Sequence, residues 1–107
     1  MKPRNVDDRE AALISLLRRF YVGEMTDGQL LRALRRDVLG LSQTRYAALV
    51  GISRRTLSDL EGDKGNVTLD VMNRVFKPLG LQVGLLPRQR HLLDDALKPS
   101  DSKKPSD

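Results

Sequence analysis

The sequence predicts an all-α protein, and three observations support this fold class. The 107 residues are 39% hydrophobic but only 4% aromatic, with no Trp, so Leu, Val, Ile and Ala must form most of the core. Apolar residues recur at helical spacing over most of the chain, and Ser, Thr and Gly stand where such helices would begin and end. A chain of this length supports one hydrophobic core rather than two independent ones.

The first two helices are expected before residue 40. Apolar residues predict a helix over about residues 6–21, which Gly23 ends. Its apolar stripe consists of Leu13, Ile14, Leu17, Phe20 and Tyr21. A second helix follows Thr26, which has capping-box spacing to Gln29, and stops at Gly40. Its apolar stripe consists of Leu30, Leu31, Leu34 and Val38.

Three shorter helices are expected next. Ser42 can cap a helix over residues 43–50, and Ser53 can cap one over about residues 54–61. Thr68 can cap a fifth helix, which ends at Pro78 and Gly80. Its apolar stripe consists of Leu69, Met72, Val75 and Phe76.

A short β-strand is expected at Leu81 to Leu86, because Leu81, Val83 and Leu85 alternate with Gln82 and Gly84. From residue 88 the chain is polar. A marginal helical turn is expected at residues 91–97, and residues 98–107 have the composition of a disordered tail.

Charge and composition narrow the classes of function. The formal net charge is +5 and the pI is near 10, which favours a polyanionic partner such as nucleic acid. The absence of Cys excludes disulfides, thiolate metal sites and cysteine nucleophiles. No secretory signal or membrane-spanning run is evident, so we expect a cytoplasmic protein without a membrane partner. The lone His91 lacks a catalytic partner; no catalytic residue, metal or cofactor is expected.

Residues 43–60 have the pattern of a helix-turn-helix. Ala47 is small where the axes of two short helices would cross, and Gly51 tolerates the positive φ of a tight turn. The second helix can bury one apolar stripe against the first. That stripe consists of Ile52, Leu57 and Leu60. The alternative is an ordinary αα-hairpin that does not bind DNA.

The exposed face of the second helix suits the major groove of DNA. The N-terminal end of a recognition helix points into this groove, where Arg can form two hydrogen bonds with guanine. We therefore expect Arg54 and Arg55 to contact bases. Ser58 and Asp59 lie one turn further, where they can contact cytosine amino groups or hold an arginine in place. The alternative is that the arginines contact only phosphates.

Phosphate contacts are expected around this face. Free N–H groups at a helix start attract phosphates, and Gln or hydroxyl side chains add hydrogen bonds. The expected phosphate contacts are Ser42, Gln43, Thr44, Ser53, Thr56 and Lys64. Arg45 is either a further contact or a solvated surface charge.

Residues from about 28 to 79 resemble the Xre-type, Cro/repressor-like helix-turn-helix family. The motif comprises Leu41-Ser42-Gln43-Thr44, Ala47, Gly51-Ile52-Ser53, Thr56-Leu57-Ser58, Leu60-Glu61 and Asn66-Val67-Thr68-Leu69. The resemblance implies a lambda-repressor-like bundle of five helices that binds double-stranded operator DNA as a homodimer. Arg45 stands where the family usually has Glu, so the capping box at Ser42 should be incomplete. Tyr46 replaces a common Leu or Val, so local packing should differ.

The continuation from Phe76 to Leu85 is similar to HipB-type antitoxins, the DNA-binding members of pairs whose toxin is a HipA-like kinase. A single strand leaves its backbone donors and acceptors unpaired, and the simplest partner is the same strand of a second subunit. Leu81, Val83 and Leu85 are therefore expected at a dimer interface. The alternative is an extended tail that packs on its own domain.

These expectations divide the chain into four parts. They are a helical extension over residues 1–25, a DNA-binding domain over 26–80, a dimerisation strand over 81–87 and a polar, disordered tail over 88–107. The expected function is an antitoxin that represses its own operon and contacts a HipA-like kinase toxin. A stand-alone phage-type regulator and a protein-interaction adaptor are the alternatives.

Overall fold

The computed structural model describes residues 6–99, and within this range every regular element is helical. The elements are α1 (Val6–Tyr21), α2 (Asp27–Ala33), the π-helical turn η1 (Leu34–Val38), α3 (Gln43–Val50), α4 (Arg54–Glu61), α5 (Leu69–Phe76), the 3-10 turn η2 (Lys77–Leu79) and α6 (Arg90–Leu97). The all-α prediction is therefore confirmed for the described residues.

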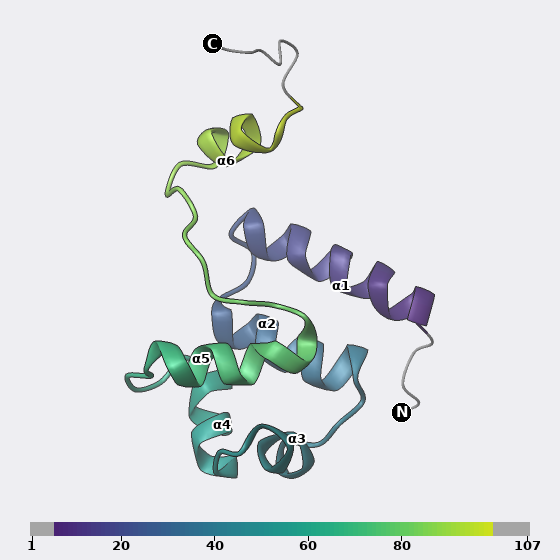
Figure 1. Cartoon of the computed structure of the whole chain (residues 1–107), viewed down its shortest axis with the longest axis vertical. Helices are drawn as coiled ribbons and strands as arrows, with labels where there is room; N and C mark the ends of the chain where they lie inside the picture. The colour runs from purple at the N-terminus through teal and green to yellow at the C-terminus, as the bar shows by residue number, and fades with distance from the viewer. Residues whose placement is uncertain (1–5, 100–107) are drawn as a thin grey trace.

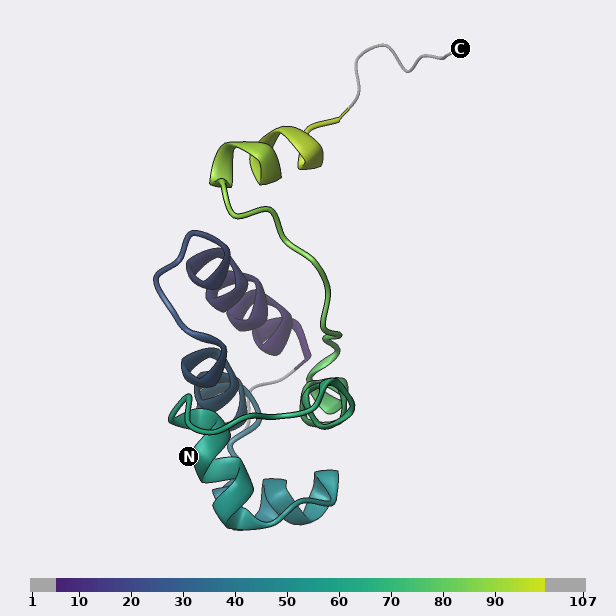
Figure 2. The same ribbon diagram turned by 90° about the vertical axis from the view of Figure 1, so that its left-hand side faces the viewer.

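The bundle is built around α2, which is contacted by α1 and by α4 (Figure 1). α3 packs against α4, and the two lie together at one end of the molecule. α6 stands apart at the opposite end, and the view turned by 90° shows the same separation (Figure 2). The helix-turn-helix segment is thus exposed at one end, while the chain after α5 runs toward the other.

Side-chain caps begin the helices where the sequence predicts them. Thr26 Oγ1 accepts a hydrogen bond from Gln29 N at 3.1 Å, and Gln29 Oε1 accepts one from Thr26 N at 2.9 Å, which completes the predicted capping box. Ser42 accepts only from the backbone N–H of Arg45, as the replacement of the usual Glu predicts. The other capping residues are Ser53 and Thr68.

The core combines the predicted stripes of α2, α4 and α5. The buried apolar side chains are Leu30, Leu31, Leu34, Val38, Tyr46, Ala47, Val50, Leu57, Leu60, Val75, Phe76 and Leu79. Three residues of the expected stripes are instead exposed: Ile14 and Tyr21 on α1, and Leu69 at the start of α5. These three positions lie at the margins of their stripes, where the single chain has too little surface to cover them.

Tyr46, which stands where a Leu or Val is common in the family, adds a polar contact to the core. Its side chain is fully buried, and its hydroxyl donates a hydrogen bond to the carbonyl of Val75, so it joins α3 to α5. Burial raises the pKa of this hydroxyl to about 12, and the negative charge of Glu61 adds to the shift.

The Tyr46 hydroxyl makes unfolding dependent on pH in the alkaline range. The pKa of the hydroxyl is about 12 in the folded protein, above the ordinary value of 10.0. Its contribution to the free energy of unfolding is therefore complete below pH 10 and is lost as the pH rises toward 12. We expect the free energy of unfolding to fall by about 2–3 kcal/mol more across this range than in a Tyr46→Phe variant. Urea denaturation at both ends of the range measures this difference. Parallel pH profiles for the two proteins would contradict it.

Residues 81–87 do not form the predicted β-strand. In the described single chain the segment is extended but makes no strand pairing, because no edge strand is available within residues 6–99. Its backbone bonds elsewhere: Leu81 N donates to the carbonyl of Phe76, and Val83 N donates to Asn73 Oδ1 at 2.9 Å. Leu85 is fully exposed. Beyond this segment, α6 occupies the site of the expected helical turn, and residues 100–107 lie outside the described range.

Gly28 allows the first turn of α2 to touch the end of α4. A Cβ atom at this buried position would lie 2.4 Å from the carbonyl oxygen of Leu60 and 2.7 Å from that of Glu61. Both obstacles are backbone atoms, which cannot rotate away as a flexible side chain can. Nothing in the local sequence pattern predicts this requirement for glycine.

We expect Gly28→Ala to lower the free energy of unfolding by about 1–3 kcal/mol, because α2 or α4 must shift to admit the methyl group. Urea denaturation measures the change. Gly62→Ala is the matched control, since a Cβ there would lie 3.4 Å or more from its nearest neighbours. Equal stability of the two variants would show that the helices separate without cost.

Candidate DNA interface

The segment from α3 to α4 has the geometry of a helix-turn-helix. Gly51 adopts the left-handed conformation, with φ of 76°, and its N–H donates to the carbonyl of Ala47. The N–H of Ile52 donates to the same carbonyl. Ala47 and Leu57 are buried between the helices. The predicted small residue, left-handed turn and apolar stripe therefore occupy their expected places.

The first turn of α4 presents two free cationic side chains. Arg54 and Arg55 are exposed, and neither guanidinium has a hydrogen-bond or ion-pair partner within the part of the chain that the structure describes. Ser53 caps the helix by accepting from Thr56 N at 2.9 Å, and it donates its own hydroxyl proton to Thr56 Oγ1 at 2.8 Å. The hydroxyl proton of Thr56 therefore remains available to an external acceptor.

The second turn of α4 is less basic. Ser58 is exposed and Asp59 is half-buried. Asp59 lies four residues after Arg55 but forms no ion pair with it or with any other described side chain, so the expected support of an arginine is not formed in the free chain. Both carboxylate oxygens of Asp59 are therefore free to accept hydrogen bonds.

The predicted phosphate contacts lie on both sides of this helix. Ser42 and Thr44 are exposed at the start of α3, and Lys64 is exposed in the loop after α4. Gln43 is half-buried, and its Nε2 donates to Glu61 Oε1 at 2.9 Å. This hydrogen bond fixes the side-chain amide of Gln43 against the end of α4.

A buried ion pair, which the local sequence pattern does not predict, holds this arrangement in place. Arg35 Nε and Nη2 donate to the two carboxylate oxygens of Glu61 at 2.6 and 2.9 Å, and Nη1 donates to the carbonyl of Leu41 at 2.8 Å. The two side chains are only 7% and 3% exposed. One signal was present: Arg35 falls on the apolar face of its helix, four residues after Leu31. The carboxylate of Glu61 thus connects η1, α4 and the start of α3.

The loop after α4 is attached to α2 by Asp63. This residue has a positive φ of 57°, and its carboxylate accepts hydrogen bonds from the hydroxyl of Thr26 and the backbone N–H of Gly28. A negative charge at a helix N-terminus is favourable. The contact holds the backbone next to Lys64 in a defined position at the edge of the α4 face.

Comparison with known proteins agrees with this geometry. A family model described as helix-turn-helix matches residues 31–86, about half of the chain. The chain belongs to the helix-turn-helix family. In proteins with this motif, the second helix of the pair enters the major groove, and that helix is α4 here.

This helix-turn-helix protein is also similar to a phage repressor. That relative is the immunity repressor protein of Bacillus phage phi105, which is 31% identical over 83 residues. The matched region covers 78% of this chain and 57% of the relative, so the chain spans little more than half of the relative's length. No solved structure matches the chain significantly.

The described residues were also compared with the requirements for metal binding and for spanning a membrane. No group of three or more His, Asp or Glu side chains there is placed to hold a metal ion. Within the same range, each helix is too short or too polar to cross a membrane.

Proposed function

We propose that this helix-turn-helix protein is a transcriptional repressor that binds a specific sequence of double-stranded DNA. The observation that carries the proposal is the pair of exposed, unpartnered guanidinium groups on the first turn of α4. A rigid helix-turn-helix holds that turn at one end of the molecule (Figure 1). The family assignment and the name of the phage relative also favour a non-enzymatic DNA-binding regulator.

In this proposal different side chains of α4 contact different base pairs of the operator. Arg54 and Arg55 contact base edges, and guanine suits each guanidinium because it offers two acceptors in the major groove. Ser58 and Asp59 lie further along the groove, where the Asp59 carboxylate can accept from a cytosine amino group.

Phosphate contacts then fix the orientation of the protein on the duplex. They are made by Ser42, Gln43, Thr44, Ser53, Thr56 and Lys64. Ser53 donates its hydroxyl proton to Thr56, so Thr56 contacts a phosphate through its hydroxyl and Ser53 does so through its backbone N–H. Gln43 keeps one amide proton beyond the one given to Glu61.

A selection experiment tests the proposed function. Purified protein is incubated with a library of random duplexes, and the bound sequences are recovered and compared. We expect one enriched palindromic site with half-sites about one helical turn apart, and protection of such a site upstream of the protein's own gene in footprinting. Recovery of unrelated sequences, bound with equal affinity, would contradict sequence-specific recognition.

We further propose that the protein binds this site as a homodimer, with Leu81, Val83 and Leu85 at the interface. The segment that carries them is extended, and Val83 and Leu85 are exposed in the single chain. Two such segments, related by a twofold axis, can pair their free backbone groups with each other.

Changing Val83 to Asp is expected to weaken the dimer at least tenfold, because each interface would then contain two buried and unpaired carboxylates. Light scattering measures the mass against the 12.0 kDa of one chain. Gln89→Asp places the same charge just beyond the segment and should leave the dimer intact. A Val83→Asp protein with the mass of a dimer would refute the assignment of these residues.

Two biological settings fit a repressor of this kind. The phage relative favours a stand-alone regulator. The similarity of Phe76 to Leu85 to HipB-type antitoxins favours a cytoplasmic antitoxin that binds a HipA-like kinase. Co-expression with a kinase-like protein encoded beside this gene separates the two settings, because only an antitoxin should form a stable complex with it.

A further inference from the structure

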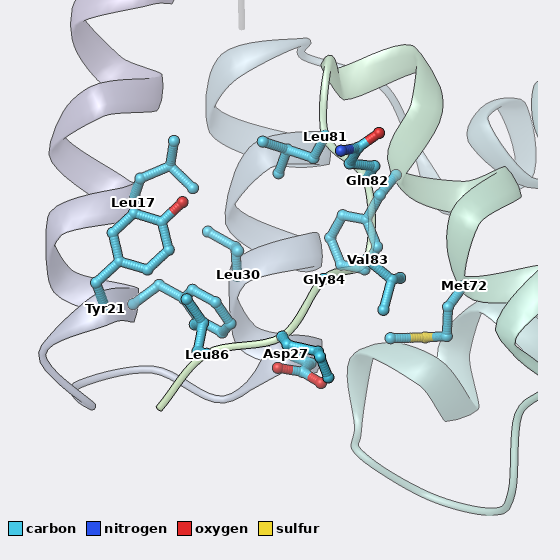
Figure 3. Close-up of a pocket in the computed structure, with 13 residues that line it drawn as sticks. Leu17, Tyr21, Asp27, Leu30, Met72, Leu81, Gln82, Val83, Gly84 and Leu86 are labelled. Carbon is cyan, nitrogen blue, oxygen red and sulfur yellow. The ribbon is translucent and has the colours of Figure 1, made fainter. Parts of the chain in front are cut away.

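An apolar groove runs between α1, α2, α5 and the extended segment after α5. Its volume is about 350 Å³, and it is open to solvent. Figure 3 shows Leu17 and Tyr21 of α1 on one side of the groove, with Leu86 beside them and Met72 of α5 on the opposite side. Leu30 of α2 lies between these walls. Side chains that are usually buried thus surround a hollow that the single chain leaves unfilled.

α6 has an apolar face without a matching surface in its own chain. Successive residues of a helix are 100° apart, so its apolar side chains share one face. They are Leu92, Leu93, Ala96 and Leu97. Leu92 is 48% exposed and Leu97 is 70% exposed. A helix of only eight residues is marginal in water, so α6 needs packing against another surface to be stable.

The groove of its own chain is a poor site for α6. Three residues, Pro87 to Gln89, connect α6 to the last residue of the groove, and they span at most about 10 Å. Leu93 instead faces a second, open hollow near the end of α1, which Val22 and Leu86 also line. α6 thus lies beyond the end of α1, where Figures 1 and 2 show it standing away from the bundle.

The charges beside the groove and on α6 are complementary. Arg18 is exposed on α1, one residue from Leu17, at the border of the groove. Asp94 is exposed on α6, one residue from Leu93, at the border of the apolar face. Within residues 6–99 neither side chain forms an ion pair. A helix seated in the groove can therefore bring opposite charges together at its edge.

We propose that α6 of one copy packs into the groove of a second copy, and that the second copy does the same in return. The proposal rests on the homodimer proposed above and adds the surface that stabilises it. The extended segment before α6 carries the chain away from its own bundle and toward the partner. Because the exchange is twofold symmetric, each helix-to-groove contact is made twice in the dimer.

Sedimentation equilibrium of the full chain without DNA tests the exchange. Leu97→Asp is expected to raise the dimer dissociation constant about 100-fold or more, since each dimer loses two buried leucines. Leu69→Asp is the matched control, because Leu69 is similarly exposed, at 62%, but lies outside the groove. Circular dichroism should show both variants folded, because both leucines are exposed in the single chain. A monomeric wild type, or a Leu97→Asp dimer of normal affinity, would overturn the proposal.

Charge reversal provides a second test that does not remove apolar surface. Arg18→Asp and Asp94→Arg should each weaken the dimer several-fold, and the double variant should recover most of the loss. Failure of the double variant to recover would refute the predicted approach of α6 to α1.

DNA binding is measured separately, with a duplex that carries a single half-site of the selected operator. We expect Leu97→Asp to retain half-site affinity, since α4 lies at the other end of the molecule. A wild type that dimerises through α6 but binds no specific DNA would leave the exchange standing and refute the proposed repressor function.

Discussion

Replacing Glu61 with Ala is expected to lower the free energy of unfolding by about 3–5 kcal/mol, because the change leaves a buried guanidinium without its counter-ion. Arg35 is only 7% exposed, and two of its three hydrogen bonds are to Glu61. The variant also removes the acceptor that holds Gln43. Urea denaturation measures the loss, which is a large fraction of the stability of a small domain.

Two further variants test whether the loss of stability comes from the unpaired buried charge. Glu24→Ala removes a carboxylate from an exposed pair with Arg19 and should change stability by less than about 1 kcal/mol. The double variant Arg35→Met/Glu61→Leu should recover most of the stability, since an apolar pair can replace a buried ion pair. If Glu61→Ala behaved like Glu24→Ala, water would have to reach the buried guanidinium. If the double variant stayed as unstable as the single one, packing rather than charge would explain the loss.

The ion pair also shows why part of the site was predictable and part was not. The capping residues Thr26, Ser42 and Ser53 each accept from the backbone N–H three residues later, so their spacing is visible in the sequence. Arg35 and Glu61 are 26 residues apart, and their contact depends on how α2 and α4 cross. Local patterns carry no information on such a crossing, although an Arg on an apolar face does indicate a buried partner.

The same reasoning applies to Gly28 and Asp63. Gly28 has an ordinary helical backbone, and the need for glycine comes from the carbonyl of Leu60, which only the folded chain brings near. Asp63 lies in the Gly-, Asp- and Asn-containing stretch between α4 and α5, whose composition is typical of a loop, and its bond to Gly28 N depends on the return of that loop to α2. Both residues were therefore invisible to spacing arguments.

The segment at residues 81–87 was predicted wrongly for a related reason. Alternation of apolar and polar residues indicates an extended backbone, and the segment is extended. A β-strand also needs a pairing partner, and the side chain of Asn73 supplies the acceptor for Val83 N in its place. Periodicity predicts conformation, whereas pairing depends on the neighbours that folding or assembly provides.

The double variant Arg54→Ala/Arg55→Ala is expected to lose about 2–6 kcal/mol of binding free energy for the selected operator, because each bidentate contact with guanine contributes about 1–3 kcal/mol. Folding should be unaffected, since neither guanidinium contacts another described side chain. Titration of a labelled duplex by fluorescence anisotropy measures the affinity, and the same titration with a scrambled duplex measures non-specific binding.

The comparison between the two duplexes decides between base and phosphate contacts. Loss of base contacts should lower the ratio of specific to non-specific affinity, whereas loss of phosphate contacts alone should lower both affinities alike and reduce their dependence on salt. Arg32→Ala removes an exposed Arg from α2, away from the helix-turn-helix, and should leave the ratio unchanged. An unchanged ratio in the double variant would mean that Arg54 and Arg55 contact only the DNA backbone, so that specificity must come from Ser58, Asp59 or the shape of the operator.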